Sequence, residues 1–276
     1  MADDVADPTG SPGGGKRVLA VIGSPHRGAT VRAVERIEAR LRLAGGIEVE
    51  YLYLRDVGLE GCRGCFCCIA EGEAFCPVHD GRDEVLARLD ACDGAIFASP
   101  NYVQNVSGLY KTFVDRLAWC CHRPRFYPKP ALAVATSAGP FGLKETLAAI
   151  QTGPAAWGFV FVDQVGVAAH PRLGAGAAST EMAEAALDRA AERLAATLHD
   201  TAPYRPERWR VLHFRSMRGL TLARPEACPA DTAYYLPLAD SDFFVPARVS
   251  PIDRLAGLVV DRAVRRHARR EYVPKP

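Results

Sequence analysis

The chain has 276 residues, a length that fits one large domain or one domain with a sizeable appendage. Its composition, with 49% hydrophobic and 24% charged residues, is that of an ordinary globular protein. The net charge of +2 argues against a dedicated nucleic-acid-binding protein, which would carry a strong basic excess. No apolar run approaches the length of a membrane span, so we expect no transmembrane helix.

The first residues of the chain differ in composition from the rest. Residues 1–15, MADDVADPTGSPGGG, are acidic at first and then rich in proline and glycine. They lack the order of a signal peptide, in which a basic stretch precedes an apolar one. We therefore interpret residues 1–15 as a disordered leader and expect a cytoplasmic protein. Disulfides rarely persist in that reducing compartment, so the nine cysteines, five of them within residues 62–76, need another explanation.

Residues 16–200 alternate short β-branched runs with longer patterns rich in alanine, leucine and arginine. The predicted strands are 17–22, 47–54, 94–98, 131–136 and 159–168, and the predicted helices between and after them are 30–44, 82–91, 107–121, 143–157 and 179–199. Strands separated by helices of this length predict right-handed crossovers and a parallel sheet covered on both faces. Five such units make a doubly wound α/β domain of three layers. Its ligands bind beyond the carboxyl ends of the strands, where the strand order reverses.

Residues 201–276 form a C-terminal extension in which this alternation stops. The segment 201–250 carries many prolines and aromatic residues and shows no clear period. A final helix is predicted over residues 252–270, and its apolar residues fall on one face: Ile252, Leu255, Ala256, Val259 and Ala263. The aromatic-rich segment could wrap a core of its own, cover a neighbouring subunit or line a substrate pocket. We favour a dimer contact or a pocket wall, because aromatic residues dominate such contacts.

The loop after the first predicted strand, residues 23–30 (GSPHRGAT), leads directly into a helix. Glycines allow a tight turn, and hydroxyls with free backbone N–H groups at the start of a helix suit a phosphate. Arg27 could add a charge-assisted hydrogen bond. The alternative is a plain tight turn in which Thr30 caps the helix. The loop matches neither a Walker A motif nor G-x-G-x-x-G.

Two further loops are predicted at the same edge of the sheet. Residues 98–108 (ASPNYVQNVSG) combine an aromatic ring with small polar groups, and residues 136–142 (TSAGPFG) are small, hydroxyl-bearing and glycine-rich. A planar ring system is bound by such a mixture, through stacking on its face and hydrogen bonds at its edge. The alternative for the first of these loops is a structural turn in which Ser107 caps the next helix. Three such loops at one edge favour a ligand-binding site.

The motifs GSPHRGAT, SPNYVQNVSGLYKTFVDR and TSAGPFG resemble those of NAD(P)H-dependent FMN reductases and iron–sulfur flavoproteins, a branch of the flavodoxin superfamily. The resemblance covers residues 16–199 and implies a flavodoxin-like fold that binds FMN. In that family the first loop holds the phosphate, the second lies along the isoalloxazine, and the third approaches its pyrimidine edge. The implied FMN contacts are Ser24, His26, Arg27, Thr30, Pro100, Asn101, Tyr102, Val103, Ser137, Ala138 and Gly139.

The resemblance has one departure and two further implications. His26 and Ala29 stand where relatives often have Arg or Lys and Asn, which would weaken or redirect the phosphate contacts. Lys111, Asp115 and Arg116 follow the second motif and are expected to be structural or to lie at a dimer interface. Because such reductases often hold the flavin between subunits, we expect a homodimer or a larger homo-oligomer.

The cysteines of residues 62–76 have the spacing of metal ligands. Cys62, Cys65, Cys68 and Cys76 follow one another as C-x2-C-x2-C-x7-C, which suits a [4Fe–4S] cluster and is similar to the run in iron–sulfur flavoproteins. Cys67 is an extra thiol that could replace Cys68 in the set. Three alternatives stay open: thiols that bind no metal, a zinc site and a redox-active dithiol.

The leading hypothesis is an FMN oxidoreductase. NAD(P)H would deliver hydride to the flavin, and a small-molecule acceptor such as a quinone would receive the electrons, directly or through the cluster. No acid–base residue is required, so we assign no catalytic side chain and place Tyr102 against the ring. The first alternative is a flavoprotein that exchanges electrons only with protein partners. The second is a flavodoxin-like binding module without flavin.

Overall fold

The structure is a computed structural model that describes residues 15–168 and 176–270, so the predicted leader lies almost entirely outside the described residues. Five parallel strands form one sheet in the order β2-β1-β3-β4-β5. Their bounds are β1 Arg17–Ile22, β2 Glu48–Tyr53, β3 Gly94–Pro100, β4 Pro130–Ser137 and β5 Val160–Ala168. The order reverses between β1 and β3, as expected for a flavodoxin-like sheet. The predicted α/β fold class is confirmed.

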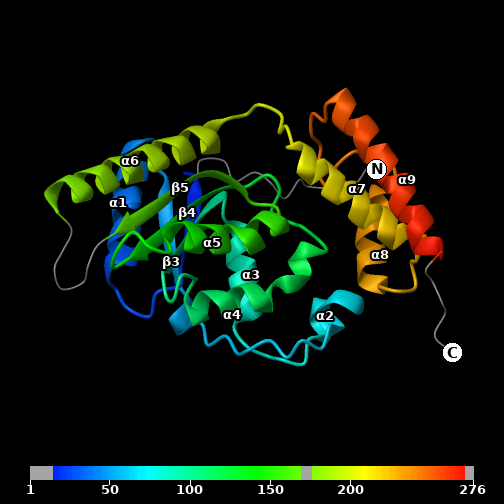
Figure 1. Ribbon diagram of the computed structural model, residues 1–276, viewed down its shortest axis with the longest axis horizontal. Coiled ribbons are helices and arrows are strands. Elements are labelled where there is room, and N and C mark those ends of the chain that lie inside the picture. Colours follow the sequence, from blue (N-terminus) through cyan, green and yellow to red (C-terminus); the bar gives the residue numbers. More distant parts are fainter. Residues whose placement is uncertain (1–14, 169–175, 271–276) are drawn as a thin grey trace, which may run out of the picture.

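Helices cover both faces of the sheet (Figure 1). One face packs against α1 (Ala29–Leu43) and α6 (Ala177–His199), and the other against α3 (Arg82–Ala91), α4 (Gly108–Arg116) and α5 (Leu143–Trp157). The consecutive residues Val18 and Leu19 of β1 point to opposite faces of the sheet and belong to the two separate hydrophobic cores, and both are fully buried. Strands buried on both faces are apolar at nearly every position, which is why the central strands β1, β3 and β4 were visible in the sequence.

One predicted helix is shorter in the structure. The prediction of 107–121 as a single helix is wrong, because α4 ends at Arg116 and a short 3-10 turn, Ala118–Cys121, follows it. The alternative role given to Ser107 is confirmed, since its hydroxyl oxygen accepts a hydrogen bond of 3.1 Å from the N–H of Tyr110. The matching role of Thr30 is not found. The cap of α1 is Gly28, and no side chain bonds to it.

The C-terminal extension holds two helices that the sequence pattern did not reveal. They are α7 (Arg208–Ala223) and α8 (Pro229–Tyr235), and the predicted last helix is α9 (Pro251–Arg270). Helices α7, α8 and α9 lie together at one end of the molecule (Figure 1). The extension has a hydrophobic core of its own, so the aromatic-rich segment packs on itself rather than serving only as a contact or a pocket wall. Together with Tyr127 of the sheet domain, this core consists of Val211, Phe214, Tyr235, Phe243, Phe244 and Val249. The division at residue 200 remains our proposal.

The packing of α9 differs from what its sequence suggests. Its predicted apolar face is exposed, with relative exposures of 68% for Ile252 and 64% for Leu255. The face that is buried instead carries Gly257, Asp261 and Ala268. Within the described part of the chain, no helix combines the length and the apolar character that crossing a bilayer demands.

A buried arginine attaches α7 to the sheet domain. Arg210 is only 4% exposed and donates to the carbonyl of Phe159 at 3.1 Å, to that of Ala155 at 3.3 Å and to the hydroxyl of Tyr127 at 3.2 Å. These acceptors lie at the end of α5 and beside the start of β5. The extension is therefore held by charge-assisted hydrogen bonds as well as by its aromatic core.

Two glycines with positive φ angles differ in whether a side chain would also clash with its surroundings. Gly158 ends α5 with a φ of 116°, and a Cβ there would lie 2.7 Å from the backbone nitrogen of Tyr127. Gly46 also has a positive φ, 67°, but a Cβ there would meet nothing within 4 Å. We expect Gly46→Ala to lower the free energy of unfolding by about 1 kcal/mol and Gly158→Ala to lower it by about 2 kcal/mol more. Urea unfolding would measure both, and equal losses would contradict the conflict with Tyr127.

Candidate functional site

Hydrogen bonds join the three predicted loops at the carboxyl edge of the sheet. The N–H of Gly23 donates to the carbonyl of Ala98 at 2.8 Å, and the hydroxyl of Ser107 donates to the carbonyl of Gly23 at 2.5 Å. The N–H of Asn101 donates to the carbonyl of Thr136 at 2.7 Å. The loops that follow β1, β3 and β4 therefore form one continuous surface.

The first loop presents backbone N–H groups rather than hydroxyls. The first hydrogen bond inside α1 runs from the N–H of Arg32 to the carbonyl of Gly28, so the N–H groups of residues 29–31 have no acceptor within the helix. The hydroxyl of Thr30 is buried against that of Thr136 at 2.7 Å. Ser24 is also buried, and its hydroxyl donates to the carbonyl of His26 at 2.8 Å. Neither hydroxyl projects from the loop.

The exposed side chains of this loop are basic or aromatic. His26 and Arg27 are exposed, and the Arg27 guanidinium lies 5.0 Å from the ring centre of Tyr53 at the end of β2. Gly28 leaves open space, because a Cβ there would meet nothing within 4 Å. The start of α1 is thus accessible, uncapped by any side chain and flanked by a cation, which is the environment that an anion prefers.

The second loop folds into a tight turn with unusual backbone angles. Tyr102 and Asn105 exchange backbone hydrogen bonds of 2.8 and 3.2 Å. Val103 and Gln104 between them have φ angles of 54° and 59°. A β-branched residue such as valine is an outlier in the left-handed region, and such strain is concentrated at functional sites. The turn leaves Tyr102 46% and Val103 98% exposed. Pro100, in contrast, is buried at the end of β3.

The third loop is tied to the second by Asn101. The Asn101 amide donates to the hydroxyl of Ser137 at 3.1 Å and to the carbonyl of Phe141 at 2.7 Å. Its side-chain oxygen is buried and has no hydrogen-bond partner among the described residues. Ala138 is exposed, Gly139 opens onto free space, and the ring of Phe141 is 85% exposed. Exposed apolar groups and small residues thus surround a polar centre.

The segment that carries the clustered cysteines, residues 62–76, is called the cysteine segment. It lies at the opposite end of α4 from the three loops, roughly 12 Å away along the helix axis. Ser107, at the start of α4, belongs to the loop surface, whereas Arg116, at its end, donates to the Cys76 sulfur at 3.2 Å and pairs with the buried Asp80 carboxylate at 2.8 Å. Burial alone would raise the pKa of the Cys76 thiol, but the hydrogen bond from Arg116 and the charges of Arg116 and Arg82 outweigh it and lower that pKa. Helix α4 therefore connects the two candidate sites.

The predicted metal ligands gather in one region. Burial and the neighbouring thiols of Cys76, Cys62 and Cys65 raise the pKa of the Cys68 thiol, so these four sulfurs are electrostatic neighbours. Cys62 and Cys65 are exposed, Cys68 is partly buried, and Cys76 is buried. All are free thiols. Among the described residues, no three Cys, His, Asp or Glu side chains have the arrangement that holds a metal ion.

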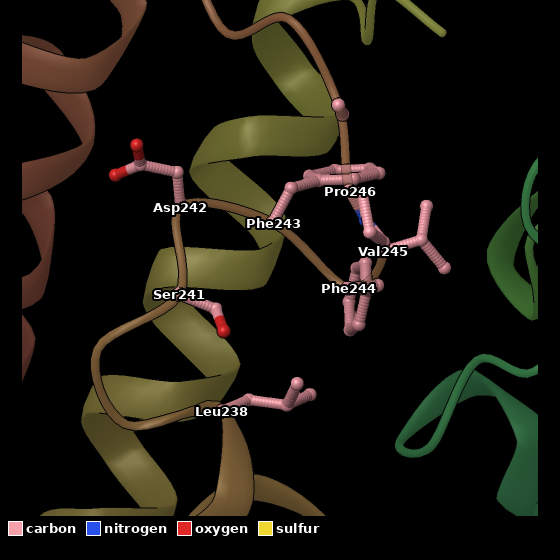
Figure 2. A pocket seen from close by; sticks show the side chains of 8 residues that line it. Leu238, Ser241, Asp242, Phe243, Phe244, Val245 and Pro246 are labelled. Atoms are coloured by element: carbon pink, nitrogen blue, oxygen red, sulfur yellow. The ribbon is translucent and has the colours of Figure 1, made fainter. Parts of the chain in front are cut away.

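The cavities found elsewhere contain no predicted site residue. One of about 1190 Å³ lies at the opposite, amino-terminal edge of the sheet and is lined by residues such as Lys16, Asp93 and Lys129. Another, of about 260 Å³, lies in the extension, where Phe243, Phe244 and Val245 project to one side of the chain and Asp242 to the other (Figure 2).

Sequence reasoning missed several residues that organise these regions. It gave Arg116 a structural or interface role without its link to Cys76, and it did not single out Arg123 or Asp231, whose buried ion pair lies beside the cysteine segment. Asp231 follows Arg123 by 108 residues, so no local spacing links the two. The sequence offers at most a weak signal, namely that Asp231 is a charged residue within a segment rich in aromatic residues.

Comparisons with known proteins agree with this arrangement. An iron–sulfur flavoprotein of Archaeoglobus fulgidus is 31% identical over 146 residues, which make up 52% of this chain and 64% of that protein. A second one, of Methanocaldococcus jannaschii, is 35% identical over 100 residues, 36% of this chain and 51% of that protein. The chain therefore spans between half and just under two thirds of these relatives.

Solved structures support the fold. The NAD(P)H:quinone oxidoreductase from Methanothermobacter marburgensis matches 66% of this chain and 100% of its own with a TM-score of 0.52 at 16% identity. The family described as NADPH-dependent FMN reductase matches residues 16–171, which include the three loops and the cysteine segment. Since this match covers more than half of the sequence, the chain belongs to the NADPH-dependent FMN reductase family.

Proposed function

We propose that this protein is an FMN-dependent oxidoreductase that takes electrons from NAD(P)H and passes them to a small acceptor such as a quinone or a flavin. The observation that carries the proposal is the surface of three joined loops around the uncapped start of α1, with Tyr102 and Val103 exposed beside it. When bound, FMN supplies the redox chemistry. The protein binds the cofactor, orients it and limits the access of water.

The start of α1 fits the FMN phosphate. The N–H groups of residues 29–31 and the guanidinium of Arg27 would hold it, and His26 is exposed close by. The hydroxyls of Ser24 and Thr30 are engaged within the protein, so we assign these two residues to shaping the loop rather than to direct side-chain contact. This differs from the roles that the resemblance implied.

The second and third loops fit a planar ring. Tyr102 and Val103 would offer apolar contact to its face. At its edge, Asn101, Ser137 and the backbone of Ala138 and Gly139 would offer hydrogen bonds. The positive φ of Val103 holds that side chain out from the surface, where it can cover the ring.

The cysteine segment fits an iron–sulfur cluster by its donor set. Four free thiols at the predicted spacing are electrostatic neighbours, and the names of the curated relatives point the same way. We propose that Cys62, Cys65, Cys68 and Cys76 hold a [4Fe–4S] cluster that accepts single electrons. Val103 and Phe141 are exposed and would suit contact with a second subunit, so a homodimer or larger assembly stays a prediction. The cytoplasmic location also stays a prediction.

A second candidate is a flavoprotein that serves only protein partners. Cys62 and Cys65 are exposed, and Phe66 beside them is 67% exposed, which would let a partner protein approach the thiols. We expect the FMN-loaded chain to oxidise NAD(P)H when a quinone is present, as followed by the loss of nicotinamide absorbance. A chain that leaves NAD(P)H unchanged but is rapidly reduced by a reduced ferredoxin would select the second candidate instead.

The phosphate assignment is tested by Arg27. This side chain is exposed, so Arg27→Ala should leave stability unchanged but weaken FMN binding about tenfold, because a charge-assisted hydrogen bond is lost. Fluorescence titration of the apoprotein with FMN gives the dissociation constant. Arg42→Ala, at the far end of α1, is the matched control and should bind FMN normally. Equal affinities in the two variants would rule out the assignment of Arg27.

The cluster assignment is tested by metal content and colour. Protein purified without oxygen should contain about four irons per chain and show a broad visible shoulder under the flavin bands. Cys65→Ser should lose the iron and the shoulder but retain FMN, whereas Cys92→Ser, a change at a buried core thiol, should retain both. Flavin bands without iron in the unchanged protein would show that the thiols bind no cluster.

A further inference from the structure

Around α2 (Cys67–Ala70) the cysteine segment packs against the apolar core of the sheet domain only through Cys68 and Ile69, which are partly buried. Helix α2 is a single turn with no buried residue, and Phe66 before it has a φ of 61° and an exposed ring. Gly64 and Gly72 on either side also have positive φ angles. With so little apolar packing, polar contacts to the backbone contribute to holding one conformation.

Arg123 provides such contacts at the end of α2. This side chain is 5% exposed and donates to the carbonyl of Cys68 at 2.6 Å and to the carbonyl of Ile69 at 3.0 Å. The last carbonyls of a helix have no N–H donor within the helix. Arg123 donates to two of them and places a positive charge at the negative end of the turn. The guanidinium is also stacked 5.2 Å from the ring centre of Trp119.

The charge of Arg123 is balanced by the C-terminal extension. Asp231 of α8 is 2% exposed and accepts a hydrogen bond from Arg123 with one oxygen, while its other oxygen lies 2.8 Å from Nδ1 of His122. The only other carboxylate at Arg123 among the described residues is Glu73, which is farther, at 3.5 Å, and partly exposed. Helix α8 lies against α2 in space, although about 160 residues separate them (Figure 1).

We propose that Arg123 and Asp231 are positioning residues of the cysteine segment. Asp231 holds the Arg123 guanidinium, and Arg123 fixes the backbone at Cys68 and Ile69 and thereby the directions of the Cys67 and Cys68 thiols. This inference rests on the proposed function for the use to which those thiols are put. The C-terminal extension then has a structural role at the site, since α8 completes the support of a redox segment that belongs to the sheet domain.

A second buried pair shows why the extension is needed. At the other end of the segment Arg116 holds the Cys76 sulfur and the Val78 carbonyl, and its carboxylate, Asp80, comes from the sheet domain itself. At the Cys68 end the sheet domain supplies the arginine but not a buried carboxylate. Because a buried cation without its partner is strongly destabilised, Arg123 would not keep this position without Asp231.

Hydrogen exchange of the full-length protein, as purified, tests the proposal. The amides of Ile69, Ala70 and Glu71 donate within the turn, and their exchange reports whether it stays closed. We expect Asp231→Asn to speed their exchange about tenfold, because removing one member of a buried ion pair costs at least that much in an equilibrium constant. Asp231→Glu, which restores the carboxylate, should return the rate toward that of the unchanged protein.

The matched control is Asp261→Asn. Asp261 is 8% exposed and pairs with the buried Arg218 of α7, so this change also removes a carboxylate from a buried arginine of the extension, away from the cysteines. It should leave the exchange of residues 69–71 within about twofold of normal. Should Asp231→Asn fail to fold, Arg123→Lys decides. It keeps the charge but lacks the fork that reaches two carbonyls, and it should also speed the exchange.

The outcomes separate this proposal from the proposed function. Unchanged exchange at residues 69–71 in Asp231→Asn, or equal acceleration there and in α3, would overturn the positioning role. Iron, sulfide and FMN are measured on the same samples. A protein without a cluster would defeat the cluster assignment yet still test the role of Arg123, and a cluster-bearing protein with unchanged exchange would defeat only the latter.

Discussion

The backbone hydrogen bonds that join the ends of β1, β3 and β4 are the contacts on which both candidate sites depend. The N–H of Gly23 donates to the carbonyl of Ala98, and the hydroxyl of Ser107 donates to the carbonyl of Gly23. The loop that follows β1 is therefore held against the start of α4. A Cβ at Gly23 would lie 2.9 Å from the Cβ of Tyr110, so only glycine permits this approach. Since α4 then runs from the loop surface to Arg116, the position of the cysteine segment follows from the same contacts.

Around the cysteine segment and where α7 is attached, the structure relies on buried arginines. Arg116 and Arg123 hold the two ends of the cysteine segment, and Arg210 attaches α7 to the end of α5. Burying a guanidinium is costly unless hydrogen bonds and a carboxylate compensate. Because of that cost, each arginine is stable with only one arrangement of its acceptors. The segments that it joins are therefore held together by the geometry of hydrogen bonds rather than by a large buried apolar area.

Buried arginines also explain which parts of the fold could be predicted. The central strands β1, β3 and β4 were visible because they are buried on both faces and almost wholly apolar, and the loops because their composition is unusual. Helix α7 was not visible: its buried positions recur with a helical period, but Arg210, Arg215 and Arg218 occupy many of them. In α9 the reverse holds, because Ile252 and Leu255 form an apolar face that is exposed. Hydrophobic periodicity fails where burial and polarity are uncoupled.

Several local rules are broken together at the carboxyl edge of the sheet. Val103 has a positive φ, the ring of Phe141 is exposed, and the first turn of α1 has no side-chain cap, although each of these features costs stability. A chain that kept this fold only as a scaffold would gain by repairing these positions. Their concentration at one edge, beside the junction of the three loops, favours a binding function for that edge over a purely structural one.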